Sequence, residues 1–176
     1  MITVQWIFGE SGDLTDAHFI REEVFIKEQN VPVEEEHDGT DELCIHAVLY
    51  ANDEPVSTGR IMISPPIGKI DKGTGKPYTH DDFIIGRVAT LKQHRGKGYA
   101  GWVMESLIKS CMIMGGERQF LHAQISAKAF YEKLDFKPIG EEFLDAGIPH
   151  IAMERFGGIG CSANKGEKSN ETGQVS

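Results

Sequence analysis

The stretch from Asp82 to Met114 constrains the fold of this chain most, because it joins a strand, a glycine-rich turn and a helix. Residues 83–91 are rich in Ile and Val, which is typical of a short, fully buried strand. The turn QHRGKGYA at 93–100, which we call the elbow, leads into a segment with an apolar residue roughly every fourth position. Gly96 and Gly98 can take backbone angles that strain other residues, so consecutive N–H groups can converge on an anion. With the helix N-terminus and three basic side chains nearby, the stretch predicts an anion site.

The elbow fits two nucleotide-type patterns. Residues 96–101 spell G-x-G-x-x-G, the dinucleotide fingerprint, which requires the turn to follow the first strand of a βαβ unit. Here the turn lies past mid-chain, after consecutive antiparallel strands, and a single strand–helix unit follows. Residues 93–98 spell Q-x-x-G-x-G, the pattern of the pyrophosphate loop in acetyl-CoA-dependent transferases. Each pattern is weak alone and a plain tight turn is a third alternative, so the rest of the chain must decide.

The whole chain has the length and composition of one globular domain. Its 176 residues are 40% hydrophobic, which is enough for a sizeable core and excludes disorder throughout. A formal net charge of −9 argues against a nucleic-acid or anionic-membrane surface, since both need a basic face. The same charge would attract a cationic or amine substrate, although acidity also serves solubility. An anionic cofactor must therefore be held locally, at the elbow.

Neither a membrane span nor a secretion signal is visible, since the chain has no apolar run of eighteen residues and no charged-then-apolar leader. Its cysteines, Cys44, Cys111 and Cys161, are widely spaced and form no C-x-x-C pair. Cys44 and Cys111 fit buried small hydrophobes better than nucleophiles. We therefore expect a protein of the reducing cytoplasm, with no membrane and no nucleic-acid partner.

Hydrophobic patterning predicts the element order β, α, loop, β, β, β, α, β, α, β, β, a mixed sheet with helices on it. Asp13 and Ser126 are expected to cap the first and last helices. One domain is expected over residues 1–156, and a disordered tail over 157–176, where apolar content collapses. The expected strands are 3–8, 43–51, 55–64, 83–91, 118–124, 136–143 and 148–156, the helices are 13–27, 99–114 and 127–134, and the loops are 28–42 and 64–81.

Two charged features of the N-terminal third leave alternatives open. Arg21 lies at the core edge of the first predicted helix, so it needs a partner. A structural ion pair with a nearby carboxylate and a place lining a substrate cleft are equal alternatives. The acidic run at 34–38 is interpreted as a solvated loop, with the rim of an amine site as the alternative.

Five stretches carry a family likeness: IREEVFIKEQNVP at 20–32, IIGRVATL at 84–91, QHRGKGYAG at 93–101, LHAQISAKAFYEKLDF at 121–136 and GEEFLDAGIPHIAM at 140–153. In this order they resemble the GNAT superfamily of acyl-CoA N-acyltransferases, and more closely its ElaA-like branch. The likeness spans most of residues 1–156. It implies the mixed α/β GNAT fold, with a central mixed sheet flanked by helices and acyl-CoA bound in a gap beside the fourth strand.

The resemblance also implies which residues bind the cosubstrate acetyl-CoA. Main-chain groups of 88–90 would bind the pantetheine arm, a main-chain N–H near Val88 would face the oxyanion, and 95–100 would surround the pyrophosphate. Gln124 stands where many relatives have an asparagine that touches the cosubstrate, and whether the longer amide keeps that contact is open. The implied set is Val88, Ala89, Thr90, Arg95, Gly96, Lys97, Gly98, Tyr99, Ala100 and Gln124.

Two residues are expected to transfer protons. Tyr131 matches the tyrosine of the family's F-Y-x-K-x-G-F helix, and a phenol with an ordinary pKa of about 10 suits protonation of the CoA thiolate. His150 matches the histidine that acts as base in enzymes resembling glyphosate N-acetyltransferase, and an imidazole can accept a proton near neutral pH. The alternatives are a packing role for Tyr131 and a structural role for His150. His122 is a poorer candidate for the base, and Asp135, where the family has glycine, is expected in strained left-handed backbone.

The expected function is transfer of the acetyl group of acetyl-CoA to a small-molecule amine by direct attack, without a metal site. Arg21, Asp38 and Arg87 are expected in the acceptor cleft, which the loops at 28–42 and 64–81 would build. The arginine set that binds an anionic substrate in glyphosate-acting enzymes is not matched. A non-catalytic acyl-CoA-binding or sensing module and a dinucleotide-dependent reductase are the alternatives. The acceptor amine and a homodimer are left open.

Overall fold

The computed structural model of the chain describes residues 1–157, so the tail predicted at 157–176 lies outside the described residues except for Gly157. No helix within residues 1–157 is long and apolar enough to cross a membrane. The strands are β1 (Ile2–Phe8), β2 (Cys44–Ala51), β3 (Glu54–Met62), β4 (Asp82–Thr90), β5 (Arg118–Gln124), β6 (Lys137–Asp145) and β7 (Ile148–Phe156). The α-helices are α1 (Thr15–Arg21), α2 (Val33–Glu36), α3 (Tyr99–Ile113) and α4 (Lys128–Glu132). A π-helical segment, η1 (Glu22–Glu28), follows α1, and the 3₁₀ turns are η2 (Asp41–Leu43), η3 (Lys92–His94) and η4 (Ile125–Ala127).

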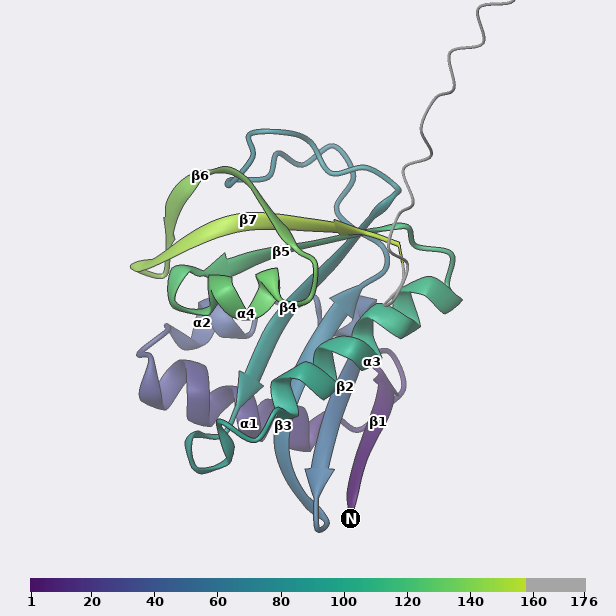
Figure 1. The fold of residues 1–176 in the computed structure, drawn as a ribbon, viewed down its shortest axis with the longest axis vertical. Coiled ribbons are helices and arrows are strands. Elements are labelled where there is room, and N and C mark those ends of the chain that lie inside the picture. The colour runs from purple at the N-terminus through teal and green to yellow at the C-terminus, as the bar shows by residue number, and fades with distance from the viewer. Residues whose placement is uncertain (158–176) are drawn as a thin grey trace, which may run out of the picture.

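The strands form one seven-stranded mixed sheet in the order β1-β2-β3-β4-β5-β7-β6 (Figure 1). β4 and β5 run parallel, and the other neighbouring strands run antiparallel. The predicted mixed α/β class and the predicted order of strands and long helices are confirmed. The elbow follows β4 directly, at the mouth of the parallel pair.

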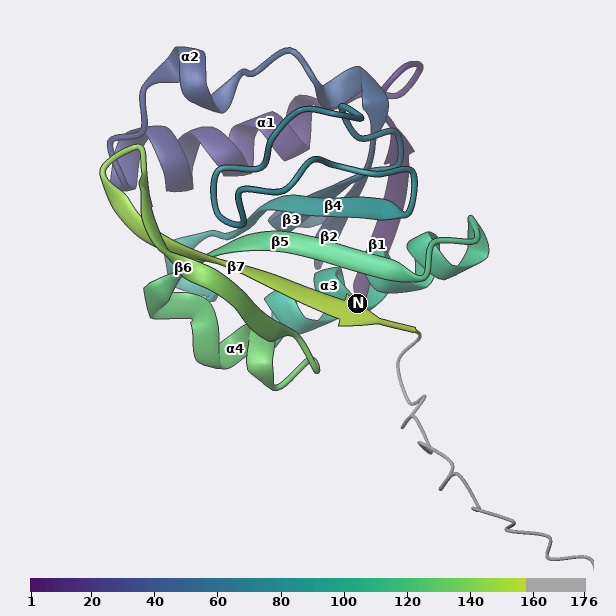
Figure 2. The same cartoon turned by 90° about the horizontal axis from the view of Figure 1, so that it is seen from above.

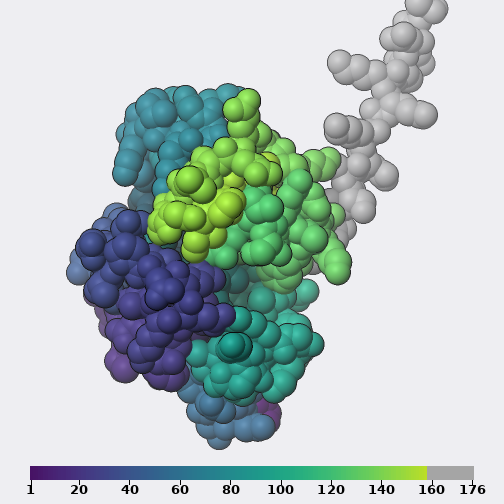
Figure 3. Space-filling view, turned by 90° about the vertical axis from the view of Figure 1, so that its left-hand side faces the viewer, coloured from purple at the N-terminus to yellow at the C-terminus, as the bar shows by residue number. Residues whose placement is uncertain are grey.

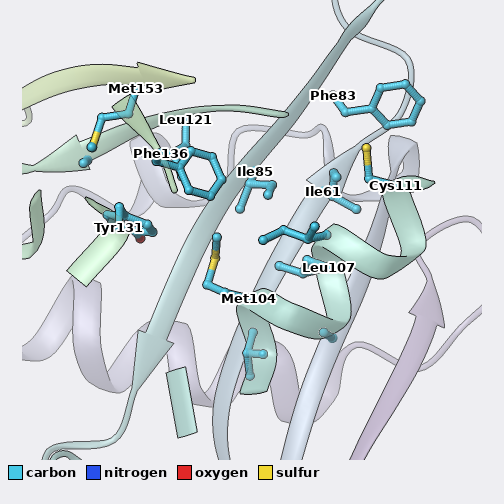
Figure 4. Close-up of a cluster of buried hydrophobic side chains, with 14 of the residues drawn as sticks. Ile61, Phe83, Ile85, Met104, Leu107, Cys111, Leu121, Tyr131, Phe136 and Met153 are labelled. Atoms are coloured by element: carbon cyan, nitrogen blue, oxygen red, sulfur yellow. The ribbon is translucent and has the colours of Figure 1, made fainter. Parts of the chain in front are cut away.

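Helices cover both faces of the sheet (Figure 2). α1, η1 and α2 lie on one face, where Ala17, Ile20 and Val24 pack in a small core with residues of β2 and β4. α3 and α4 lie on the other face, over a larger core (Figure 4). That larger core includes Ile61, Phe83, Ile85, Met104, Leu107, Cys111, Leu121, Tyr131, Phe136 and Met153.

The helical segments differ in detail from the prediction. The helix expected over 13–27 is α1 followed by η1, in which the backbone N–H of Gln29 donates to the carbonyl of Val24 at 3.1 Å. Asp13 does not cap α1 as its N-cap residue, but accepts the backbone N–H of Thr15 at 2.9 Å. The prediction of Ser126 as a cap is wrong, because η4 contains this residue and α4 begins only after the turn.

β4 and β5 diverge halfway along their length. Their Cα partners run from Asp82–Arg118 to Ile85–Leu121 and stop there. β4 continues along β3 through a register shift, and Arg87 within the shift has a φ of 54°. Such a bulge leaves a residue out of the ladder and bends the strand. The gap expected beside the fourth strand is therefore present, bordered by backbone of residues 86–90 on one side.

Asp135 has the left-handed backbone expected of it, with a φ of 65°. Its N–H donates to the carbonyl of Glu132 at 3.1 Å as the chain leaves α4. Asp tolerates this region better than most residues with a Cβ, so the helix can end here without glycine.

Candidate active site

A cavity of about 1060 Å³ opens where β4 and β5 diverge. Residues from η1, α2, β4, the elbow, β5, α4, β7 and the loop at 64–81 line it. Figure 3 shows the face of the molecule on which these segments meet, with the N-terminal helices in purple and blue and the β6–β7 hairpin in yellow-green. A concave site of this size, with main-chain groups on one wall and a few titratable side chains, is typical of small-ligand sites.

The elbow presents backbone N–H groups to the cavity. Gly96 and Gly98 have φ angles of 76° and 81°, and Gly98 is the N-cap residue of α3. No side chain caps this helix, and a Cβ built on either glycine would meet nothing within 4 Å. Space is therefore open beside the N-terminus of α3, where the first N–H groups lack partners within the helix and the partial positive charge suits an anion.

The two cations of the elbow itself are placed differently. Arg95 lines the cavity and binds both carboxylate oxygens of Glu28, at 2.7 and 2.8 Å, which raises the pKa of the guanidinium. Arg95 also donates to the carbonyl of Thr90 at 3.0 Å, so it ties η1 to the end of β4. Lys97 does not line the cavity, whereas the rest of the predicted acetyl-CoA set does.

The bulge in β4 supplies main-chain groups beside the gap. Val88, Ala89 and Thr90 line the cavity. Ala89 pairs with Thr58 of β3, but the next registered pair is Gly86–Arg60, so Arg87 and Val88 fall outside the ladder. Backbone groups in such a bulge are available to a ligand.

Tyr131 lies on α4, and its ring packs in the larger core (Figure 4). The residue also lines the cavity. It is 8% exposed, and burial raises the pKa of its hydroxyl well above the ordinary value. The ring packs edge-on against Phe130 and Phe136, with centroids 5.0 and 6.0 Å apart. Burial is the cause of this rise in the pKa. The hydroxyl is therefore protonated at neutral pH.

His150 lies near the start of β7, opposite Gln124 of β5. Its Nδ1 is 2.7 Å from the carbonyl oxygen of Ile148, and because a carbonyl only accepts, Nδ1 carries the proton. Its ring stacks on Phe143, with centroids 5.9 Å apart. Nε2 then holds the lone pair of the neutral ring, and it is not one of the buried, unpartnered nitrogens of the described chain. It is thus open to the cavity that His150 lines, which is the arrangement a base requires.

Gln124 lines the cavity and bridges two of its walls. Its amide nitrogen donates to Oε1 of Gln29, just after η1, at 2.8 Å. The contact between Gln124 and acetyl-CoA stays a prediction. To make it, the Gln124 amide would have to bond to Gln29 and acetyl-CoA together, or release Gln29.

Arg21 is 1% exposed and its guanidinium is enclosed by carboxylates. It pairs with Glu36 and with both oxygens of Asp41, at 2.8 and 3.0 Å. Arg21 does not line the cavity, so its contacts fit a structural ion pair rather than a place in the substrate cleft. Glu36, which it holds, does line the cavity.

Asp38 and Arg87 both line the cavity and belong to the same network. Asp38 accepts from Arg60 at 2.5 and 3.2 Å and from Arg87 at 3.2 Å. Burial raises the pKa of Asp38, but the bonds and charge of Arg60 outweigh it and bring the pKa to about 2. Arg87 also pairs through Nε with Glu36 at 2.8 Å.

The interpretation of residues 34–38 as a solvated loop is wrong for Glu36. This residue ends α2, is 1% exposed, and lies between the guanidinium groups of Arg21 and Arg87. Its burial depends on cations from α1 and β4, which are distant in the sequence, so composition alone could not reveal it. Glu34 and Glu35 are exposed, as expected.

The structure brings His122, a poorer candidate from sequence, into the site. His122 lies on β5, lines the cavity and has Nε2 2.7 Å from Oδ2 of Asp71. Asp71 belongs to the loop at 64–81 and is 3% exposed. No sequence signal indicates this pair, because the irregular loop alone brings residues 71 and 122 together.

Metal ligation and thiol chemistry find no support in this part of the chain. No group of three His, Cys, Asp or Glu residues within residues 1–157 could hold a metal ion. Cys44 and Cys111 are buried, and burial raises the pKa of both thiols, that of Cys44 to about 11. Cys161 lies outside the described residues.

Comparisons with known proteins identify the family of this chain. Residues 21–155 match the acetyltransferase (GNAT) domain family. YjcF of Bacillus subtilis (strain 168), named an uncharacterized N-acetyltransferase, is 40% identical over 141 residues, which cover 80% of this chain and 90% of YjcF. The crystal structure of Escherichia coli ElaA is 27% identical with a TM-score of 0.72, over 88% of this chain and 99% of ElaA. An acyl-CoA N-acyltransferase from Pseudomonas aeruginosa, at 24% identity and a TM-score of 0.70, shares the fold over 88% of this chain and 99% of its own. The chain belongs to the GNAT family of acetyltransferases.

Proposed function

We propose that this protein transfers the acetyl group of acetyl-CoA to the amine of a small molecule, by direct attack in a ternary complex. The observation that carries the proposal is that one cavity joins the elbow, the gap beside β4, Tyr131 and His150. The elbow suits a pyrophosphate, and the gap suits an extended pantetheine arm that bonds to β4 like an added strand. Acyl transfer between two bound substrates then needs orientation and proton transfer rather than a covalent nucleophile.

The residues divide the proton transfers between them. Nε2 of His150 accepts the proton that the acceptor ammonium loses, and the freed lone pair forms the new C–N bond at the thioester carbonyl carbon. A main-chain N–H near Val88 faces the negative charge that develops on the carbonyl oxygen. Tyr131 gives its hydroxyl proton to the sulphur as the C–S bond breaks. Burial raises the pKa of this hydroxyl, which keeps the proton on Tyr131 until the thiolate forms.

The charge of the chain favours a cationic acceptor. The net charge of −9 attracts an ammonium, whereas the carboxylates of Asp38 and Asp145 at the cavity wall are already paired with cations of the protein. The cytoplasmic location and a homodimer stay predictions.

Thermal unfolding with acetyl-CoA, CoA and NADH tests the cosubstrate. A ligand at a hundred times its dissociation constant adds about 2.7 kcal/mol, which raises the midpoint of a domain this size by about 5–11 °C. We expect this rise with both CoA species and none with NADH. No rise with either CoA species at saturation would contradict the proposal, and a rise with NADH alone would favour the reductase.

Thiol release from acetyl-CoA tests turnover across a panel of a monoamine, a diamine, an amino alcohol and an amino acid. We expect release with at least one amine, and a fall in kcat of about 10²-fold or more in His150→Asn. Asn keeps a donor to the Ile148 carbonyl, so acetyl-CoA binding and folding should persist while the base is lost. Unchanged turnover in His150→Asn would rule out His150 as the base. Binding without release for every amine would favour the acyl-CoA-sensing alternative.

A further inference from the structure

The two ring nitrogens of His122 lie in different surroundings. Nε2 is 2.7 Å from Oδ2 of Asp71, and because an ionised carboxylate only accepts, Nε2 carries the ring proton. Nδ1 of the neutral ring then holds a lone pair. It is not one of the buried, unpartnered side-chain nitrogens within residues 1–157, so it is open to the cavity that His122 lines.

Asp71 is held firmly enough to fix this arrangement. Its Oδ1 accepts the backbone N–H groups of Gly73 and Thr74 at 3.1 and 2.8 Å, and its Oδ2 accepts the Tyr78 hydroxyl at 2.6 Å. Burial raises the pKa of Asp71, but the hydrogen bonds from Tyr78 and Thr74 lower it, so the carboxylate stays ionised. The loop at 64–81 is itself tied to the end of β6 by Lys72–Asp145, at 2.5 Å.

His122 and His150 project from neighbouring strands on the same side of the sheet. His122 pairs with Ala152 and Gln124 pairs with His150, so the two histidines are diagonal neighbours, whose Cβ atoms typically lie somewhat less than about 7–8 Å apart. Both rings contact Phe143, with centroids 4.8 Å apart for His122 and 5.9 Å for His150. Two imidazoles, each with one nitrogen fixed by the protein and one open nitrogen, therefore flank the same part of the cavity.

We propose that the acceptor amine is held between these two histidines, with Nδ1 of His122 accepting a hydrogen bond from it. The inference rests on the proposed function and deepens it. An acceptor ammonium carries several N–H donors, of which one proton must leave and the others must be held so that the lone pair points at the thioester carbon. Nε2 of His150 takes the leaving proton and Nδ1 of His122 holds a second N–H through bond formation. His122 keeps its own Nε2 proton on Asp71 throughout, so its protonation does not change.

Two substitutions separate this role from that of a structural tie to the loop. In His122→Gln the side-chain amide nitrogen reaches the position of Nε2 and can still donate to Asp71, but nothing replaces Nδ1. In His122→Asn the amide group reaches the position of Nδ1 and can accept, but the bond to Asp71 is lost. We expect His122→Gln to lower kcat/KM for the amine about tenfold or more, mostly through KM, with acetyl-CoA binding unchanged. His122→Asn should keep KM nearer to that of the unsubstituted protein while its thermal midpoint falls.

The opposite pattern, with normal kinetics in His122→Gln and impaired kinetics in His122→Asn, would assign His122 to the structural tie and overturn the proposal. Nitrogen NMR of histidine-labelled protein gives a second test that needs no amine, since it distinguishes a protonated from an unprotonated ring nitrogen. We expect His122 with Nε2 protonated and Nδ1 unprotonated, and the reverse tautomer would also overturn it. Absence of thiol release in the unsubstituted protein would instead overturn the proposed function, and this inference with it.

Discussion

Tyr131 lies on α4 with its ring buried in the larger core, which raises the pKa of its hydroxyl further above neutral pH. Tyr131→Phe removes the hydroxyl without disturbing the ring contacts to Phe130 and Phe136. We expect kcat for thiol release to fall about 10²-fold, because the departing thiolate loses its acid, while acetyl-CoA binding and the unfolding midpoint persist. Tyr50→Phe, which loses a hydroxyl bonded to Asp16 outside the cavity, is the control and should keep full kcat. Full activity in Tyr131→Phe would return this residue to a packing role.

Arg21 shows how strongly one buried charge can couple to its neighbours. Arg21→Met leaves Glu36 buried with one cation fewer and removes the bonds to Asp41. Breaking a buried pair in this way typically destabilises by about 3–5 kcal/mol, because the remaining charge is uncompensated. Urea unfolding should show this loss for Arg21→Met. Lys27→Met, which removes an exposed pair with Glu23, should unfold at nearly the original urea concentration, and equal losses in both variants would contradict the assignment.

At the scale of elements, the sequence predicts best where local chemistry decides. β5 was expected over 118–124 and forms over those residues, and the elbow, the hairpin of β2 and β3, and the histidine of β7 lie where their patterns indicated. α2 was missed although three acidic residues follow Pro32, a composition that favours a helix N-terminus. The arginines that bury Glu36 and the loop that brings Asp71 to His122 are contacts between distant segments, which no local pattern encodes.

The elbow depends on backbone that only glycine adopts without strain. Gly98→Ala places a Cβ at a φ of 81°, which we expect to destabilise by about 1 kcal/mol and to weaken acetyl-CoA binding. Gly101 lies three residues later, within α3. A Cβ added there meets nothing within 4 Å and the backbone has no positive φ, so Gly101→Ala should stabilise the protein by up to about 1 kcal/mol through its higher helix propensity. Thermal unfolding compares the two. If both substitutions shift the midpoint in the same direction, the positive φ of Gly98 is not the reason that this position needs glycine.

At the scale of the whole molecule, three arginines and three carboxylates form one ion-pair network in a protein that is acidic overall. Arg21, Arg60 and Arg87 are matched by Glu36, Asp38 and Asp41, so the network beside the cavity is formally neutral while the chain is not. The network joins α1, α2, β3 and β4, and thus sets the spacing between the N-terminal helices and the sheet.

This network predicts how stability depends on pH. The pKa of Asp38 is about 2 in the folded protein, below its value of about 3.9 in an unfolded chain, so its contribution is fully present above that higher pKa. The contribution is lost as pH falls through the folded pKa. Because Asp38 is exposed, solvent screens its ion pairs, and we expect Asp38→Asn to lose only about 1 kcal/mol at neutral pH, a difference that narrows between about pH 4 and pH 2. Urea unfolding across this range measures it, and a difference independent of pH would exclude the ion pairs as its source.

The divergence of β4 from β5 gives the sheet a third open edge, in its interior. The outer edges, β1 and β6, can in principle accept a strand from any other chain, which is the usual hazard of exposed strands. The interior edge borders a cavity that residues of η1, the elbow and α4 also line, so other parts of the same chain surround it. The fold thereby holds an unpaired stretch of strand inside a cavity, where another chain has less access to it than to an outer edge.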